Sequence, residues 1–271
     1  MNGATQQAMN SALQPVTKKI MKTILIYTIL LPLVAFFTAP PKKKIKIFLA
    51  GDSTMSIKDP RAYPETGWGM PFVQFWDSSV TVVNRARNGR STKTFISEGL
   101  WKSIYNEAGE GDYVIIQFGH NDESVEKKER YTTPDTFKMN LHRFIKETRE
   151  KKATPVLCTP VSRRKFDKEG NAVETHTQYS ALVREVARET GVLFIDLDEQ
   201  TRALYQQFGP ENSKWLFLQL QPGEHPNYPD GRNDNTHFNE LGARLVAQIV
   251  LKEIKQLLPE LTTYIAVPVK K

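Results

Sequence analysis

Short runs of apolar and β-branched residues alternate with helix-like stretches along most of this chain. Five such runs occur, at 45–50, 80–84, 113–118, 155–159 and 192–196. A strand followed by a helix and a second strand favours a βαβ unit, in which both strands lie parallel in one sheet. The sequence therefore predicts an α/β fold, with helices covering a parallel sheet.

Helical patterns fill the stretches between and after these runs. They are predicted near 69–77, 91–106, 135–151, 175–190 and 239–258. The last is the clearest, because apolar residues recur at helical spacing and Asn239 is a suitable N-cap. His142 and His176 fall on predicted helices and are expected to face solvent. The segment Gly209–His237 shows no convincing regular pattern, and its aromatic and proline residues favour an ordered, functional loop.

The N-terminal part of the chain has a different character. Lys18, Lys19 and Lys22 precede an apolar stretch at 23–39, a pattern typical of a secretory signal peptide. We expect residues 1–44 to be an N-terminal extension with a signal peptide around 21–39, followed by one folded domain at 45–265. The protein is then secreted or periplasmic, and a single membrane anchor is the alternative.

Charge and cysteine content limit the possible partners. The formal net charge is +7, but eight lysines outside residues 45–269 account for all of it. Nucleic-acid binding needs basic residues clustered in the folded part, so no nucleic-acid partner is expected. We also expect no membrane contact beyond the signal segment, and a monomer. Cys158 is the only cysteine; its apolar surroundings predict a buried, unreactive thiol.

Polar motifs follow the first three predicted strands. They are Gly51-Asp52-Ser53, Gly89 and Gly119-His120-Asn121. Open parallel sheets bind ligands beyond the carboxyl ends of their strands. Each motif alone is also explained by an ordinary turn or helix cap, and His120 is not assigned a catalytic role.

A carboxylate precedes a histidine by three residues in Asp234-Asn235-Thr236-His237. Such a carboxylate can accept a hydrogen bond from Nδ1 of the imidazole and leave Nε2 free to take a serine proton. Alone, this pair is more often a local hydrogen bond. Together with the strand-end motifs, it supplies the nucleophile, base, orienting acid and oxyanion donors that acyl transfer requires.

In order, these motifs resemble the sequence blocks of the SGNH (GDSL-type) hydrolases. The segments 66–69, 84–92 and 225–231 resemble the rhamnogalacturonan acetylesterase subfamily. The resemblance covers about residues 45–260. It implies a three-layer α/β/α sandwich with a flavodoxin-like, five-stranded parallel sheet in the order 2-1-3-4-5.

The resemblance also implies a role for each motif residue. Ser53 is the nucleophile, His237 the general base and Asp234 the residue that orients it. The oxyanion hole consists of the backbone N–H groups of Ser53 and Gly89 and the side chain of Asn121. The implied activity is a secreted serine esterase that removes acetyl groups from plant cell-wall polysaccharide, with rhamnogalacturonan as the expected substrate, and it needs no cofactor and no metal.

The substrate-binding residues are predicted less directly. Arg85, Arg87 and Arg90 follow the second strand and either bind carboxylates of a galacturonate polymer or bridge acidic residues within the fold. Of these, Arg87 and Arg90 are taken as substrate-binding candidates. Trp68 and Tyr228 lie in the segments that resemble the subfamily and complete the set.

Several alternatives stay open at this point. The same site chemistry would serve an SGNH esterase for acetyl xylan, short-chain esters or lysophospholipids. An inactive carbohydrate-binding protein on the same scaffold and a flavodoxin-like FMN binder belong to other functional classes. The α/β-hydrolase fold is disfavoured because Ser53 lacks the second glycine of Gly-x-Ser-x-Gly. A metal site could be built from His225, Asp230, Asp234 and His237.

Overall fold

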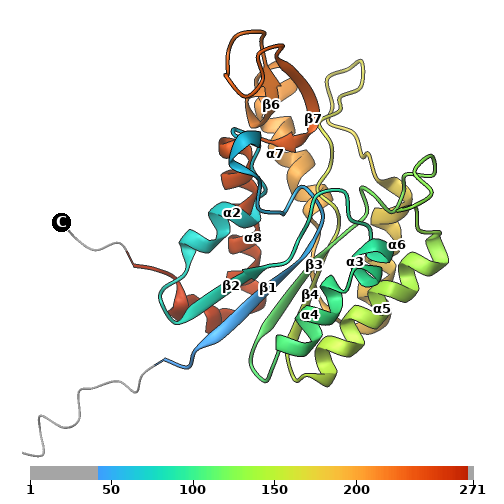
Figure 1. Ribbon diagram of the computed structural model, residues 1–271, viewed down its shortest axis with the longest axis vertical. Coiled ribbons are helices and arrows are strands. Elements are labelled where there is room, and N and C mark those ends of the chain that lie inside the picture. Colours follow the sequence, from blue (N-terminus) through green and yellow to red (C-terminus); the bar gives the residue numbers. More distant parts are fainter. Residues whose placement is uncertain (1–41, 268–271) are drawn as a thin grey trace, which may run out of the picture. The chain divides into compact units, whose positions relative to one another are not determined.

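A single parallel sheet forms the centre of the computed structural model, which describes residues 42–267 (Figure 1). Its five strands are β1 (Ile45–Gly51), β2 (Val80–Asn84), β3 (Tyr113–Gln117), β4 (Thr154–Cys158) and β5 (Leu193–Ile195). They are all parallel and lie in the order β2-β1-β3-β4-β5. This confirms the predicted strand order.

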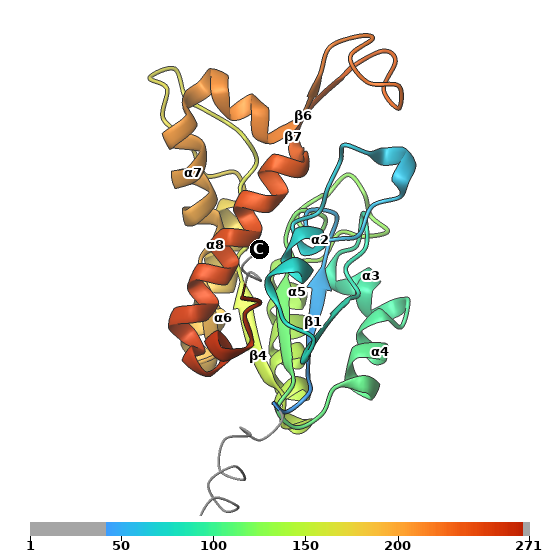
Figure 2. The ribbon, with the colours of Figure 1, turned by 90° about the vertical axis from the view of Figure 1, so that its left-hand side faces the viewer.

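Helices cover both faces of this sheet, as Figures 1 and 2 show. The first face carries α2 (Gly69–Phe72), α7 (Leu197–Asn212) and α8 (Glu240–Leu257). The second face carries α3 (Thr92–Ser97), α4 (Leu100–Glu107), α5 (Pro134–Glu150) and α6 (Thr177–Thr190). The three-layer α/β/α sandwich is therefore confirmed.

The residues of β1 show why the sheet is buried on both sides. Ile47 and Leu49 pack into the apolar core under α2 and α8, whereas Phe48 and Ala50 pack into the core under α3 to α6. Successive side chains of a strand point to opposite faces. A strand covered on both faces thus needs apolar residues at every position, which is why the five runs were clear in the sequence.

The predicted helices are found, with local breaks. The pattern at 91–106 divides into α3 and α4 at Gly99, whose φ of 74° favours glycine. The pattern at 69–77 becomes the short α2 and a 3₁₀ turn at Val73–Phe75. Asn239 caps α8 as predicted, since its side chain accepts a hydrogen bond from the N–H of Gly242. Two further 3₁₀ turns lie at Pro60–Ala62 and Pro259–Tyr264.

The prediction that Gly209–His237 lacks regular structure is wrong. Helix α7 continues to Asn212 past a kink at Gly209 and is followed by a 3₁₀ turn at Ser213–Leu216. Strand β6 (Phe217–Leu220) then pairs antiparallel with β7 (Arg232–Phe238) in a second, two-stranded sheet. Only the connection between these two strands is a loop.

The folded unit begins at Lys44. The predicted signal peptide around 21–39 lies outside the described residues. Within residues 42–267, no helix is both long and apolar enough to cross a membrane.

Candidate active site

The predicted catalytic residues meet at the carboxyl edge of the main sheet. Ser53, Gly89 and Asn121 follow β1, β2 and β3, which are neighbours in the sheet. Asp234 and His237 come from β7. All five line one cavity of about 340 Å³. The order of the strands therefore brings together residues that lie far apart in the sequence.

The three residues assigned to the triad are connected by two hydrogen bonds. His237 Nε2 lies 2.9 Å from Ser53 Oγ, and His237 Nδ1 lies 2.8 Å from Asp234 Oδ2. Asp234 Oδ1 also accepts the backbone N–H groups of Thr236 and His237. Burial opposes ionisation of Asp234, but its hydrogen bonds with His237 and Thr236 outweigh burial and lower its pKa. The carboxylate thus stays charged and holds the imidazole with Nε2 facing the serine.

A hydrogen-bonded series of buried side chains holds the turn that carries Ser53. Asp52 Oδ1 accepts hydrogen bonds from the backbone N–H and the hydroxyl of Thr54. Gln117 donates to the Thr54 hydroxyl at 2.7 Å and accepts the indole N–H of Trp68 at 2.8 Å. Asp52 Oδ1, the Thr54 hydroxyl, the Gln117 amide and the Trp68 indole thus each have a hydrogen-bond partner, whereas the buried Asp52 Oδ2 has none among the residues that the structure describes.

Trp68 needs a correction. Its side chain is 0% exposed and packs in the core against Phe72. A side chain that no solvent reaches cannot contact a polysaccharide, so its assignment to substrate binding is wrong. Its function in the fold is to fix Gln117, and through it the turn that carries Ser53.

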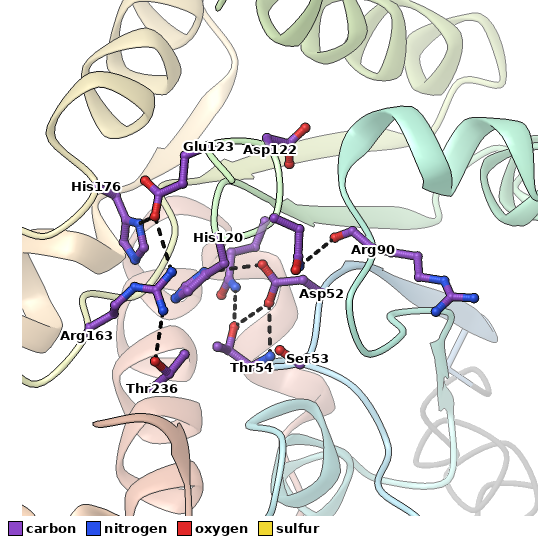
Figure 3. A network of polar contacts seen from close by, with 12 residues as sticks. Asp52, Ser53, Thr54, Arg90, His120, Asp122, Glu123, Arg163, His176 and Thr236 are labelled. Carbon is purple, nitrogen blue, oxygen red and sulfur yellow. Dashed lines mark hydrogen bonds and ion pairs between the residues drawn. The ribbon is translucent and has the colours of Figure 1, made fainter. Parts of the chain in front are cut away.

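A buried polar network continues from Asp52 away from the serine (Figure 3). His120 Nδ1 lies 3.3 Å from Asp52 Oδ2, and the rings of His120 and His176 are 4.2 Å apart. His176 contacts Glu123, which pairs with Arg163 at 3.2 Å. His176 is 1% exposed, so the prediction that it faces solvent is wrong; it lies at the start of α6 and is covered by His120.

Arg163 connects this network to β7, the strand that carries His237. It donates to the hydroxyl of Thr236 at 3.0 Å, directly beside His237. The loop after β4 is thereby attached to β7. No sequence motif pointed to Arg163, because its partners belong to other loops.

Burial shifts the pKa of the acidic and basic groups in this network. Burial and the charge of His176 lower the pKa of His120 to about 4. Burial opposes ionisation of Asp52, but His120 and Thr54 outweigh it and lower the Asp52 pKa to about 2. For Asp122, burial dominates over hydrogen bonds from Thr92 and raises the pKa to about 7.

We expect His120 and Asp122 to make the stability depend on pH in opposite directions. Between pH 6.5, the ordinary histidine value, and about 4, the unfolded chain binds a proton that folded His120 does not, so stability falls as the pH is lowered. Folded Asp122 binds a proton below about pH 7, the unfolded residue only below 3.8, so its contribution falls as the pH is raised between these values.

Two variants separate these contributions. We compare the stability at about pH 4.5 with that at about pH 7. Relative to wild type, His120→Gln should raise the melting temperature at about pH 4.5 with respect to that at about pH 7, and Asp122→Asn should lower it. In each variant the corresponding difference in the free energy of unfolding should change by roughly 3 kcal/mol, since one pKa unit corresponds to about 1.4 kcal/mol. Calorimetric melts of the three proteins measure it. Parallel pH profiles for all three would show that neither group titrates as described.

The remaining substrate-binding candidates do not line the cavity around Ser53. Arg90 pairs with Glu98, and its neighbour Arg85 with Glu107, so both bridge acids within the fold. Arg87 is exposed. Tyr228 donates its hydroxyl to the carbonyl of Ala62 and so attaches its loop to the segment after β1. Binding of substrate by Arg87, Arg90 and Tyr228 stays a prediction.

The cavity contains cationic side chains that the sequence patterns did not indicate. They are Lys127, Arg130, Arg163 and Arg232. Against these four cations the lining has two carboxylates: Glu65, paired with Lys58 at 2.7 Å, and Asp234, which lies 2.8 Å from His237 and 3.4 Å from Arg232. Outside the lining, Glu123 pairs with Arg163 and the exposed Glu129 with Arg130. The cavity therefore has an excess of positive charge.

Cys158 is buried, and burial raises its pKa, as expected of an unreactive thiol.

Among residues 42–267, no three His, Cys, Asp or Glu side chains are grouped closely enough to hold a metal ion. The alternative cluster of His225, Asp230, Asp234 and His237 therefore does not assemble.

Comparison with known proteins identifies the family. Residues 49–245 match the model of the GDSL-like lipase/acylhydrolase family. The chain belongs to this family. Among curated proteins, the GDSL-type chain is 46% identical to a rhamnogalacturonan acetylesterase of Bacillus subtilis, over 80% of this chain and 92% of the relative. A probable rhamnogalacturonan acetylesterase of the same organism is 36% identical, over 78% of this chain and 93% of the relative.

Solved structures agree with the fold of this GDSL-type chain. A Bacillus subtilis protein of known crystal structure gives a TM-score of 0.68 at 27% identity, covering 80% of this chain and 57% of the other. An acetyl-xylooligosaccharide esterase from Geobacillus stearothermophilus gives 0.56 at 20% identity, covering 78% and 94%; at this identity the likeness concerns the fold alone. The family and its relatives show that the chain is a carboxylic ester hydrolase.

Proposed function

We propose that this esterase removes acetyl groups from rhamnogalacturonan, through an acyl-enzyme on Ser53, outside the cytoplasm. The observation that carries the proposal is the continuous hydrogen-bonded series from Ser53 Oγ through His237 to Asp234, with distances of 2.9 and 2.8 Å. The relatives named above support the substrate, and the lysines followed by an apolar stretch at 23–39 support export.

In the first half of the reaction, Ser53 Oγ attacks the carbonyl carbon of the acetyl ester while His237 Nε2 takes the hydroxyl proton. The carbonyl oxygen becomes an oxyanion, which the N–H groups of Ser53 and Gly89 and the amide of Asn121 stabilise. The bond to the sugar oxygen then breaks. His237 gives its proton to that oxygen, so that the sugar hydroxyl leaves and Ser53 carries the acetyl group.

In the second half, water attacks the acetyl-serine ester. His237 takes a proton from the water, and the same donors stabilise the second oxyanion. When the bond between the acetyl carbon and Ser53 Oγ breaks, His237 returns the proton to Ser53 and acetic acid is released. Asp234 stays charged throughout and stabilises the imidazolium that forms in each half.

The charge of the cavity supports an acidic polymer over a neutral one. Rhamnogalacturonan contains galacturonate carboxylates, whereas xylan chains carry few acidic groups. Lysine and arginine side chains around a concave site raise the local concentration of an anionic substrate. Lys127 is exposed and lines the cavity, so it is placed to meet such a carboxylate.

This account predicts a substrate preference that salt removes. Acetate release from acetylated rhamnogalacturonan should exceed that from acetylated xylan, and kcat/KM on the acidic polymer alone should fall as salt screens the cavity charge. Lys127→Gln should lower kcat/KM on the acidic polymer by roughly two- to fivefold, an effect of up to about 1 kcal/mol. The neighbouring Lys128 does not line the cavity, so Lys128→Gln is the matched control.

Higher activity on xylan, without a salt effect on either polymer, would favour the alternative of an esterase for neutral acetylated glycans and leave the serine chemistry untouched.

Export is tested separately. Mature protein that lacks residues up to about 39 should be found in the medium or the periplasm, and full-length protein in the cytosol would contradict export.

A further inference from the structure

The amide of Asn121 is fixed in one orientation by its two neighbours. Its Nδ2 donates to the carbonyl oxygen of Arg90 at 3.0 Å, and its Oδ1 accepts from Nη1 of Arg130 at 2.9 Å. A carbonyl cannot donate and a guanidinium cannot accept, so a flipped amide would lose both bonds. With one N–H on the Arg90 carbonyl, the second N–H of Asn121 stays available for the cavity.

The same nitrogen of Arg130 also lies against Gly89. Nη1 is 3.5 Å from the Gly89 carbonyl oxygen, and a Cβ added to Gly89 would lie 3.1 Å from this same Nη1. One guanidinium therefore contacts two of the three residues assigned to the oxyanion hole. It reaches them from the loop after β3 and so connects the ends of β2 and β3.

The charge of Arg130 is only weakly compensated. The side chain is 23% exposed, and Glu129, whose carboxylate lies 3.5 Å from Nε, is 72% exposed. An exposed partner is screened by water and neutralises little. A partly buried cation behind an amide oxygen draws electron density from the amide, which makes its N–H groups better donors.

We propose that Arg130 is a positioning residue of the oxyanion hole. It holds the Asn121 amide with its free N–H toward the reacting carbonyl oxygen, and strengthens that N–H as a donor. The inference rests on the proposed function, since it assumes an oxyanion at this position. It differs from direct binding of a substrate carboxylate by Arg130, which the test distinguishes.

The first measurement is the split between kcat and KM on p-nitrophenyl acetate, which carries no carboxylate. Arg130→Met should lower kcat by about 10- to 100-fold, less than the 10²- to 10³-fold expected for loss of the donor itself, with KM unchanged within about twofold. Arg130→Lys should restore part of kcat, because a lysine keeps the charge but not the rigid, planar guanidinium. Arg143, an exposed arginine paired with Glu147 on α5, provides the control Arg143→Met.

A double-mutant cycle with Asn121→Ala separates positioning from other roles. If Arg130 acts through Asn121, adding Arg130→Met to Asn121→Ala should lower kcat by less than about threefold. Equal losses in both backgrounds, or a rise in KM on rhamnogalacturonan without a fall in kcat on p-nitrophenyl acetate, would overturn the inference. Thermal melts identify a folding defect, in which case Arg130→Lys completes the cycle.

Ser53→Ala in the same assay keeps the two proposals apart. A Ser53→Ala variant as active as the wild type would refute the serine mechanism itself. An inactive Ser53→Ala together with an additive cycle would refute only the role of Arg130.

Discussion

Ser53→Ala is expected to lower kcat for acetate release by about 10⁶-fold, the scale seen when a serine hydrolase loses its nucleophile. The reason is that the proposed mechanism forms the acyl-enzyme on Ser53 Oγ, and no other hydroxyl lies within hydrogen-bonding distance of His237 Nε2 among the contacts found in residues 42–267. The variant should keep its melting temperature, because His237 is the one partner of the Ser53 hydroxyl within the described part of the chain. Acetate release at saturating substrate measures the loss.

The base should be nearly as important as the nucleophile. His237→Ala removes the group proposed to take the serine proton and should cost a similar factor. Because nucleophile and base act as one unit, the double variant of Ser53 and His237 should be little worse than either single variant. A double variant that loses the product of the two factors would show that the residues act independently, contrary to the hydrogen bond between them.

Asp234→Asn is expected to be less damaging than loss of Ser53 or His237, with a loss of kcat on the order of 10⁴-fold. Asp234 Oδ1 accepts the backbone N–H groups of Thr236 and His237, so the carbonyl oxygen of the new amide should take that position. Its NH₂ group then faces His237 Nδ1 and donates to it. The imidazole proton is forced onto Nε2, where it blocks removal of the serine proton.

Asp234→Ala should be milder than Asp234→Asn, because water can take the place of the lost carboxylate and accept from Nδ1. The order of the two variants is therefore the decisive result, measured as kcat at neutral pH beside melting curves. If alanine proved more damaging than asparagine, the structural bonds of Asp234 to its own turn would outweigh its effect on the tautomer.

The parts of the fold that the sequence revealed are those with a local signal. All five strands of the main sheet lie within the predicted runs or one residue beyond them at either end, because parallel strands buried on both faces consist of apolar residues throughout. Asn239 marked the start of α8 for a similarly local reason: its side chain closes a bond within the first turn of the helix.

The second sheet gave no such signal. β7 reads Arg-Asn-Asp-Asn-Thr-His-Phe and has one apolar residue, so neither alternation nor a continuous apolar run marks it as a strand. Its conformation depends on pairing with β6, a contact that no local pattern reports. Helix α7 was missed although Leu197, Thr201 and Tyr205 are buried at helical spacing, and this spacing could have been noticed.

The residues of the candidate site likewise divide into those with a local sequence signal and those without one. Ser53, Gly89, Asn121, Asp234 and His237 could be named in advance because each lies in a short motif, and strand order then explains their meeting. Arg130 and Arg163 could not, because their contacts join separate loops: Arg130 and Gly89 are 41 positions apart, and Arg163 and Thr236 are 73 apart. Trp68 was misassigned because a motif does not distinguish a core aromatic from an exposed one.

The central claim is that Ser53 carries the acyl group during turnover. A fluorophosphonate probe reacts covalently with an activated serine and mimics the acyl-enzyme, so intact-protein mass spectrometry of wild type and Ser53→Ala tests the claim directly. The account predicts one adduct per wild-type chain, mapped by peptide analysis to Ser53, and no adduct in Ser53→Ala. Equal labelling of both proteins, or an active wild-type enzyme that the probe neither labels nor inhibits, would contradict it.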